Sequence, residues 1–331
     1  MCETLDHEDG RVILVPTGDG RRRVRVTPAK PTTRIARNGC LTSYPRDLIE
    51  RILRLRGPAG LGDEISRDEE PGYTSLSIGN LLLAHSATSE AAAGEVLDFG
   101  CGCGASTVVL GRMFPESRIL GLDLDEKMLD VARARARHWG LGNVRFALSS
   151  GARLPENVST FDSVMLSAVY EHLTPDERGP LLRELWSVLR PGGRLHICET
   201  PYRWFPVDAH TTLLPLVNYL PSFLALRLAR RFSPTVSRGQ DWESLLRMGV
   251  RGATTREITR ILRRAGGGEP VLIRPNLRGR RTWTDLWFAG PTLHSYPRGR
   301  RVVRLVSAAL ERSIGVPIVP FLSLAFRKAP L

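Results

Sequence analysis

The chain has 331 residues, enough to bury the core of one catalytic domain with appended segments. A hydrophobic content of 42% and a charged content of 24% are typical of globular proteins and exclude a disordered chain or a fibre. The formal net charge of +13 raises the question of nucleic acid as a partner. However, only three of the 47 basic residues are lysines, and such an excess of arginine is better explained by codon usage than by selection for phosphate contacts. We therefore do not expect a nucleic-acid partner.

Residues 1–40 are a basic N-terminal segment that the sequence predicts to be a hairpin or a flexible tail. A hairpin is indicated by two apolar runs, Val12–Val15 and Val24–Val26, on either side of the turn Gly18-Asp19-Gly20. Residues 41–93 are predicted to form a helical cap. Apolar residues follow helical spacing from Tyr44 to Arg56, where we expect Gly57-Pro58 to end the helix, and again from Leu76 to His85.

From residue 94 short apolar strands alternate with amphipathic helices, which is typical of a parallel sheet covered on both faces. The expected strands are Glu95–Phe99, Arg118–Asp123, Val144–Ala147, Ser163–Ser167 and Arg194–Cys198. The expected helices are Ser106–Met113, Glu126–Trp139 and Pro180–Leu189. This order predicts an α/β, doubly wound fold over residues 94–331.

After Cys198 the periodicity is lost in a segment rich in proline and aromatic residues, which we interpret as a lid insertion at about 201–250. A capping box, Thr254-Thr255-Arg256-Glu257, then opens a helix that ends at Gly266-Gly267-Gly268. The remaining expected elements are the strands Val271–Arg274 and Phe321–Arg327 and, between them, a basic helix from about Arg300 to Ser313.

The sequence predicts a cytoplasmic protein. Its five cysteines are an odd number, and Met1 to Asp9 is acidic without the apolar core of a signal peptide. The longest apolar stretch, Leu213 to Ala229, contains two prolines and an arginine and is too short to span a bilayer. Two predicted helices, Ser222–Arg231 and Arg300–Ser313, combine apolar faces with arginines. Two interpretations stay open: the helices contact an anionic inner membrane surface peripherally, or their basic faces are simply exposed to solvent.

The strongest functional signal is the segment Val96-Leu97-Asp98-Phe99-Gly100-Cys101-Gly102-Cys103-Gly104. Alternate glycines after a strand let the backbone turn tightly and approach a ligand closely, while the amides of the next helix point at that ligand. An adenosine-bearing cofactor is implied. Gly100, Gly102 and Ala105 also satisfy the dinucleotide pattern, but Asp98 would repel a pyrophosphate and could instead receive an ammonium group.

A second signal, Gly121-Leu122-Asp123-Leu124-Asp125, ends the next predicted strand. A carboxylate there accepts hydrogen bonds from the ribose hydroxyls, each worth about 1.5–3 kcal/mol. We assign that role to Asp123 and expect Asp125 to be the N-cap of the following helix.

In order along the chain, VLDFGCGCG, LGLDLDEKML, FDSVMLSAVYEHL and LRPGGRLHICETP resemble the motifs of class I, type-11-like S-adenosylmethionine-dependent methyltransferases. The resemblance covers residues 94–200 strongly and extends loosely to the C-terminal LAFRKAP. It implies a Rossmann-like, seven-stranded sheet whose last strand is antiparallel, and S-adenosyl-L-methionine as the cofactor.

The cofactor-binding residues that the resemblance implies are Asp98, Gly100, Cys101, Gly102, Asp123, Leu124, Ser150, Gly151 and Ser167. Those around the first turn would face the methionine half, Asp123 the ribose, Leu124 the adenine and Ser167 the sulfonium. Many relatives carry an acid ahead of the Leu-Pro pair for the adenine amine. Here Leu154-Pro155 lacks it, so Ser150 or backbone groups must serve instead.

Methyl transfer requires nucleophile, methyl group and sulfur to be aligned, which can contribute roughly 7–11 kcal/mol. A hydroxyl nucleophile also needs a base. The candidate catalytic residues are His172 and Tyr170, in Tyr170-Glu171-His172, and His210 in the proline-rich segment. For each histidine an ordinary structural position is the alternative. We expect no metal, because ubiquinone-biosynthesis O-methyltransferases bind one through a Glu-His pair and an upstream acid, and Ala168 stands at that acid's position.

The sequence therefore predicts a methyltransferase that acts on a small-molecule, sugar- or lipid-linked acceptor, most readily at oxygen, beneath an aromatic lid. Two alternatives stay open. One is an NAD(P)-dependent oxidoreductase, and the other is a catalytically silent methyltransferase-fold binding protein.

Overall fold

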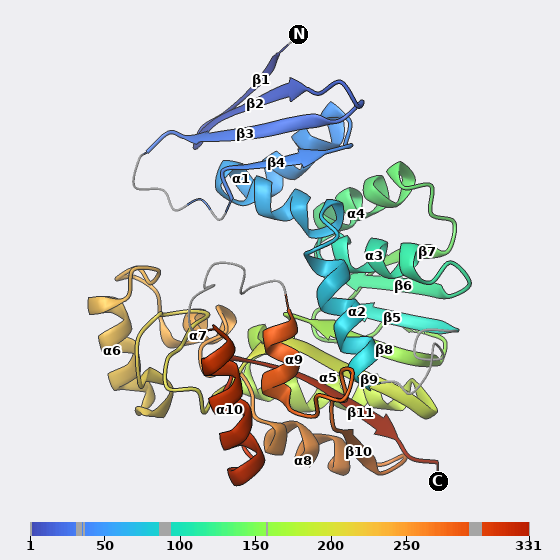
Figure 1. The fold of residues 1–331 in the computed structure, drawn as a ribbon, viewed down its shortest axis with the longest axis vertical. Coiled ribbons are helices and arrows are strands. Elements are labelled where there is room, and N and C mark those ends of the chain that lie inside the picture. The colour runs from blue at the N-terminus through green and yellow to red at the C-terminus, as the bar shows by residue number, and fades with distance from the viewer. Residues whose placement is uncertain are drawn as a thin grey trace. The chain divides into compact units, whose positions relative to one another are not determined.

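The computed structural model describes residues 2–30, 35, 37–85, 94–156, 158–290 and 300–330. The chain divides into two compact units, Met1–Gly79 with Cys101–Leu148 and Asn80–Gly100 with Ser149–Leu331. Figure 1 labels the helices and strands of both units.

The first unit begins with an antiparallel sheet in the order β1-β2-β3-β4 (Figure 1). Its strands are β1 (Glu3–His7), β2 (Gly10–Pro16), β3 (Arg22–Pro28) and β4 (Gly39–Thr42). The hairpin predicted within residues 1–40 is confirmed, since β2 and β3 pair antiparallel with Val12 opposite Val26 and Leu14 opposite Val24. These four side chains are buried, so one face of the hairpin is apolar.

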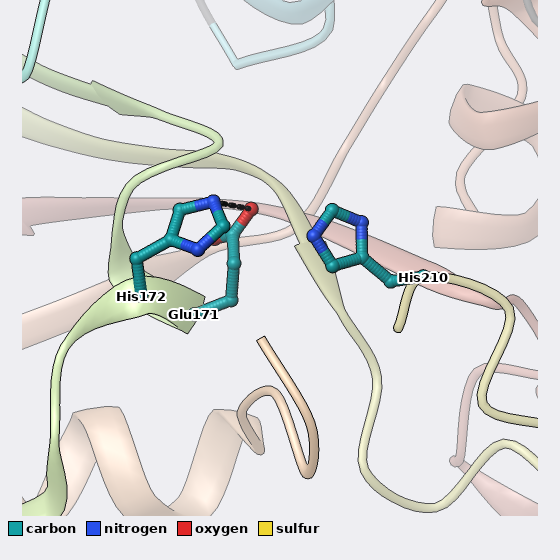
Figure 2. Close-up of side chains that lie close together, drawn as sticks. All are labelled: Glu171, His172 and His210. Atoms are coloured by element: carbon teal, nitrogen blue, oxygen red, sulfur yellow. Dashed lines mark ion pairs between the residues drawn. The ribbon is translucent and has the colours of Figure 1, made fainter. Parts of the chain in front are cut away.

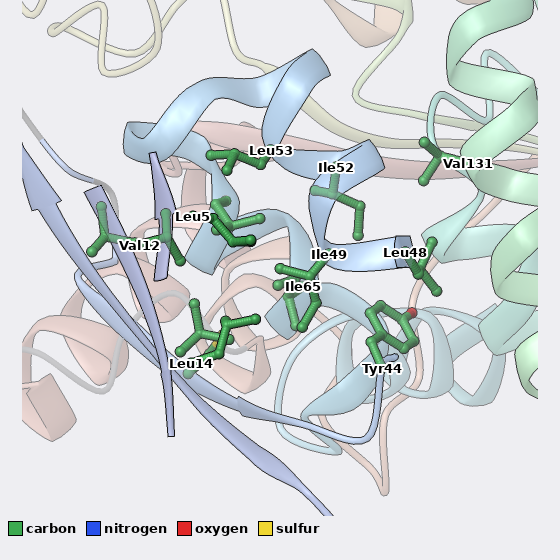
Figure 3. Close-up of a cluster of buried hydrophobic side chains, with 14 of the residues drawn as sticks. Leu5, Val12, Leu14, Tyr44, Leu48, Ile49, Ile52, Leu53, Ile65 and Val131 are labelled. Atoms are coloured by element: carbon green, nitrogen blue, oxygen red, sulfur yellow. The ribbon is translucent and has the colours of Figure 1, made fainter. Parts of the chain in front are cut away.

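Helix α1 (Arg46–Glu69) covers that apolar face and is bent at Gly57. Figure 3 shows side chains of the helix, among them Ile49 and Ile65, pointing toward Leu5 and Leu14 of the strands. The prediction that Gly57-Pro58 ends a helix is incomplete. Gly57 leaves helical geometry with φ 61° and ψ 175°, but Pro58 begins a second helical segment, where its missing N–H costs no hydrogen bond.

A seven-stranded sheet has the order β10-β11-β9-β8-β5-β6-β7. Its strands are β5 (Glu95–Phe99), β6 (Arg118–Asp123), β7 (Val144–Leu148), β8 (Phe161–Ser167), β9 (Leu189–Pro201), β10 (Pro270–Ile273) and β11 (Phe321–Lys328). β8 pairs in parallel with β5 and β9, β6 pairs in parallel with β7, and β11 runs antiparallel to β9 and β10. The predicted Rossmann-like sheet with an antiparallel last strand is confirmed.

Local signals explain where several helices begin. The remaining α-helices are α2 (Thr74–His85), α3 (Ala105–Met113), α4 (Glu126–His138), α5 (Pro175–Ser187), α6 (Ser222–Phe232), α7 (Trp242–Arg247), α8 (Thr255–Ala265), α9 (Trp283–Ala289) and α10 (Arg300–Ile314). Asp125 caps α4 by accepting the Lys127 N–H, as predicted. Helix α5 begins five residues before the expected Pro180, because Thr174 and Glu177 form a capping box that the sequence analysis missed.

Between β9 and α8 the chain forms α6, α7 and the short 3₁₀ helix η3 (Val217–Tyr219). A small apolar cluster of Ala229, Val236, Leu245 and Val250 holds this region together. The boundaries of the predicted cap and lid remain predictions. Among the helices that the structure describes, none combines the length and the apolar content needed to cross a bilayer.

Candidate cofactor and acid–base site

Glycine is required in the turn after β5 for two different reasons. Gly102 and Gly104 have φ of 54° and 80°, values that L side chains rarely adopt. A Cβ atom at Gly104 would lie 2.5 Å from Cβ of Ala132, so this glycine lets α4 pack closely. At Gly102 the nearest atom to an added Cβ would be Sδ of Met128 at 4.0 Å. The space over Gly102 is therefore open, as a ligand that approaches the backbone requires.

Asp123 fixes this turn from the end of β6. Its Oδ2 accepts the Gly102 N–H at 2.8 Å, and its Oδ1 accepts the Asp125 N–H at 3.0 Å. Each carboxylate oxygen has a second lone pair for a ribose hydroxyl. The neighbouring Leu124 is 68% exposed, and Cys101 is buried with its N–H bonded to the carbonyl of Leu122. The Gly102–Asp123 pairing fits an adenosyl cofactor.

Strands β5 and β8 are neighbours in the sheet. After β5 the chain continues to β6, whereas after β8 it continues to β9, in the opposite direction along the strand order. Ligands of such sheets bind outside the carboxyl ends of the strands at this switch point. Asp98 of β5 is buried, and Ser167 at the end of β8 is half-buried. An added Cβ at Gly100 would lie 2.5 Å from Cγ2 of Val169, so Val169 supports the turn. Ser150 and Gly151 are exposed, and their predicted contact with adenine stays a prediction.

Beyond β8 the structure brings together Glu171, His172 and His210, two of which the sequence analysis had selected. Figure 2 shows the Glu171 carboxylate between the two imidazole rings. Nε2 of His172 lies 4.0 Å from Oε1 of Glu171, and the ring centroids of the two histidines are 5.7 Å apart. Glu171 and His172 belong to the 3₁₀ helix η2 (Tyr170–His172), whereas His210 comes from the insertion after β9.

Burial controls the electrostatics of this cluster. Glu171 has no exposed surface, which raises the pKa of its carboxyl to about 8, although a hydrogen bond from Thr200 partly opposes the shift. The pKa of His210 is lowered mainly by burial and, to a smaller extent, by the neighbouring His172. A neutral imidazole at His210 can accept a proton.

The third candidate is Tyr170. Its side chain is fully buried and its hydroxyl donates to Oε1 of Glu257 at 2.9 Å. Burial raises the pKa of this phenol further, so Tyr170 cannot serve as a base near neutral pH. Tyr170 therefore positions η2. Ala168 takes φ 54°, an uncommon conformation for a residue with a Cβ.

Sequence reasoning missed two residues of this cluster. Glu171 stands beside two selected residues, but its burial arises from the surrounding fold. Gly249 had no sequence signal, yet an added Cβ there would lie 2.6 Å from Cδ2 of His210 and 3.3 Å from Cγ of Glu171. The absence of a side chain at Gly249 makes room for the cluster.

Residues 96–193 match a family model described as a methyltransferase domain. The chain is 36% identical over 141 residues to the demethylmenaquinone methyltransferase of Clavibacter sepedonicus, covering 41% of this chain and 55% of the relative. It is 32% identical over 128 residues to the demethylmenaquinone methyltransferase of Lactococcus lactis subsp. lactis, covering 38% of this chain and 50% of the relative. The chain thus spans about half the length of these curated relatives.

Among solved structures, the apo form of the S-adenosylmethionine-dependent methyltransferase SibL is similar at 18% identity and a TM-score of 0.45, covering 87% of this chain and 64% of that one. The stronger findings are the family match, the strand order and the turn that Asp123 holds. Residues 96–193 therefore match a methyltransferase domain, and the strand order and the turn fit the class I fold that binds S-adenosylmethionine.

Proposed function

We propose that the protein transfers a methyl group from S-adenosylmethionine to an oxygen of a small-molecule, sugar- or lipid-linked acceptor. The observation that carries the proposal is the open turn at Gly102, held by the Asp123 carboxylate within the segment that matches the family. The relatives are named as methyltransferases of a quinone precursor, which supports a small organic acceptor.

An oxygen acceptor is supported by the cluster of Glu171, His172 and His210. In the reaction the acceptor oxygen bonds to the methyl carbon while the bond from that carbon to sulfur breaks and leaves a neutral thioether. The hydroxyl proton must go to a base, and the His210 imidazole, neutral at pH 7, is our choice for it. His172 is the second choice, because one of its ring nitrogens is engaged by the Arg247 carbonyl oxygen.

The proposal is tested with a labelled methyl donor and fractionated cell extract, followed by mass analysis of the product that gains the label. We expect label on an oxygen. His210→Ala should lower kcat by about 10²–10⁴-fold while the affinity for S-adenosylhomocysteine stays unchanged. Labelled carbon or nitrogen would contradict the choice of acceptor atom. Thermal stabilisation by NAD(P) but not by S-adenosylhomocysteine would favour the oxidoreductase instead.

A lipid-linked acceptor would bring the protein to a membrane surface, and we include peripheral contact through α6 and α10 in the proposal. Helix α6 exposes Phe223 and Phe232 beside Arg227 and Arg231. The exposed apolar side chains of α10 are Val302, Val303, Leu305, Val306, Leu310 and Ile314. Apolar side chains with arginines beside them suit an anionic lipid surface.

Sedimentation with vesicles tests this contact. Anionic phosphatidylglycerol vesicles should carry the protein down and neutral phosphatidylcholine vesicles should not. Leu305→Glu should reduce that binding more than Ser313→Glu, which adds the same charge to an exposed polar position of α10. Equal effects of the two substitutions would argue against insertion of the apolar side chains.

A further inference from the structure

We propose that Glu171, His172 and His210 form a binding site for a divalent first-row transition metal ion, of which Zn²⁺ is the best match. One ligand atom from each residue, a carboxylate oxygen or a ring nitrogen, lies within 4.8 Å of the other two. The residues come from η2 and from the insertion after β9 and converge around one point (Figure 2).

The orientation of His172 favours metal binding. Its Nδ1 lies 2.6 Å from the carbonyl oxygen of Arg247, a hydrogen bond in which the ring must donate. The proton therefore resides on Nδ1, and Nε2 presents a lone pair toward Glu171. A backbone carbonyl that fixes the tautomer in this way commonly orients metal-binding histidines.

A bound cation would be a suitable partner for one oxygen of the Glu171 carboxylate. Its Oε2 accepts a hydrogen bond from Thr200 at 3.2 Å, whereas its buried Oε1 has no hydrogen-bond donor within the part of the chain that the structure describes. A buried oxygen without a donor is costly. Two arginines on adjoining elements form their ion pairs with other carboxylates, Arg178 with Glu257 and Arg247 with Glu177.

The spacing of the cluster suits an intervening atom. The 4.0 Å between Nε2 of His172 and Oε1 of Glu171 is too long for a direct hydrogen bond. Zinc–ligand bonds of about 2.0–2.2 Å would require the three side chains to draw together slightly. Gly249 leaves the necessary space, because a Cβ there would lie 3.0 Å from Nε2 of His210.

The donor set identifies the class of ion. Two neutral imidazoles and one carboxylate suit Zn²⁺ and similar ions, whereas Mg²⁺ prefers oxygen ligands. The expectation of no metal was based on Ala168 and did not consider His210, a third ligand from another segment.

Three protein ligands leave a coordination position for an acceptor oxygen. That role rests on the proposed function, and binding of the ion does not. With the ion in place His210 would be a ligand and could not also be the base of the proposed function, and the ion itself would make an acceptor hydroxyl more acidic.

The test uses the full chain after removal of metals with a chelator. Titration with Zn²⁺, followed by calorimetry, should show one ion per chain, and Mg²⁺ at the same concentration should give no heat. Co²⁺ should give the visible spectrum of nitrogen and oxygen ligands without a thiolate charge-transfer band. His172→Ala and His210→Gln should each weaken binding about tenfold or more, and His7→Ala, in the first unit, should not.

Circular dichroism establishes that each variant is folded. Absence of binding to the wild-type chain, or unchanged affinity in folded His210→Gln, would overturn the site. A thiolate band that persists in both histidine variants would place the ion on cysteines and would also overturn it. Binding of one ion by a chain that transfers no methyl group would support the metal site and count against the proposed function, so the two failures are distinguishable.

Discussion

At the scale of single residues, Asp123 is the most direct test of cofactor binding. Its carboxylate holds the Gly102 N–H and is expected to accept the ribose hydroxyls. Loss of one charge-assisted hydrogen bond costs about 1.5–3 kcal/mol, so Asp123→Ala should weaken binding of S-adenosylhomocysteine by about 10- to 150-fold. Isothermal calorimetry on the purified chain measures this affinity.

Asp125→Ala is the matched control, two positions along the same segment. The Asp125 side chain caps α4 through the Lys127 N–H and has no assigned contact with the cofactor. Its removal should lower the free energy of unfolding by about 0.5–2 kcal/mol without changing the affinity. Equal losses of affinity in the two variants would mean that the conformation of the loop, and not the ribose contact, had been disturbed.

Two glycines of the same turn should respond differently to alanine. In Gly104→Ala the new Cβ would meet Cβ and Cα of Ala132 at 2.5 and 2.9 Å, so the chain should be strongly destabilised. In Gly102→Ala only backbone strain of about 1–2 kcal/mol is expected, but the methyl group would occupy the open space assigned to the ligand. Thermal unfolding and calorimetry together should find Gly102→Ala folded and deficient in cofactor binding. A Gly102→Ala chain with normal affinity would contradict this placement.

The sequence predicted the parts of the candidate site that are local in the chain. The glycine turn and Asp123 follow or end consecutive strands. The alternation of apolar strands and amphipathic helices in the sequence is therefore enough to predict their positions at the ends of those strands. The acid–base cluster depends on contacts between distant segments. His210 was selected for its place after a strand, but the burial of Glu171 and the space at Gly249 follow from packing that no local pattern encodes.

At the scale of elements, the bend in α1 depends on Gly57. Its φ of 61° with ψ of 175° is a combination that essentially only glycine adopts. Gly57→Ala should therefore lower the free energy of unfolding by about 1–3 kcal/mol. Gly179→Ala, within α5, should have the opposite sign, because it gains about 0.5–1 kcal/mol of helix propensity and its Cβ would meet only the flexible end of Arg183 at 3.9 Å. Urea denaturation measures both, and a stabilised Gly57→Ala would show that the bend is not required.

Strand and helix predictions succeeded where burial is continuous. β5 and β6 have the predicted bounds because they are apolar runs within a sheet covered on both faces. The missed elements carry weaker signals: β1 contains three charged or titratable residues among five, and α7 and α9 are six and seven residues long. Such short helices depend on tertiary contacts. The carboxylate of Glu311, for example, accepts the first two backbone N–H groups of α9.

At the scale of the whole molecule, the count of 47 basic residues overstates the number that are free at the surface. Arg135 is fully buried in the first unit, where it pairs with Glu64 at 3.1 Å and Asp68 at 3.8 Å. Arg178, 6% exposed, pairs with Glu257 in the second unit. Some arginines are therefore structural partners of buried or half-buried carboxylates.

Two buried histidines of the second unit should make stability depend on pH. Burial lowers the pKa of His196 to about 3 and that of His85 to about 4, and their rings are 6.3 Å apart. In the unfolded chain both should titrate near pH 6.5. The unfolded state therefore binds protons first, and this contribution to stability is fully present above about pH 6.5 and is lost as the pH falls toward 4 and then 3.

The expected loss is about 1.4 kcal/mol per pH unit for each histidine. His196→Leu removes one titrating group whose ring nitrogens have no hydrogen-bond partner among the described residues. Urea denaturation from pH 7 to pH 4 should therefore show a shallower loss of stability in His196→Leu than in the wild type, and the same slope as wild type in the control His7→Ala. Because carboxylates titrate in all three chains, only the difference between slopes reports on the histidine. Identical slopes in His196→Leu and wild type would mean that His196 gains its proton without unfolding the chain.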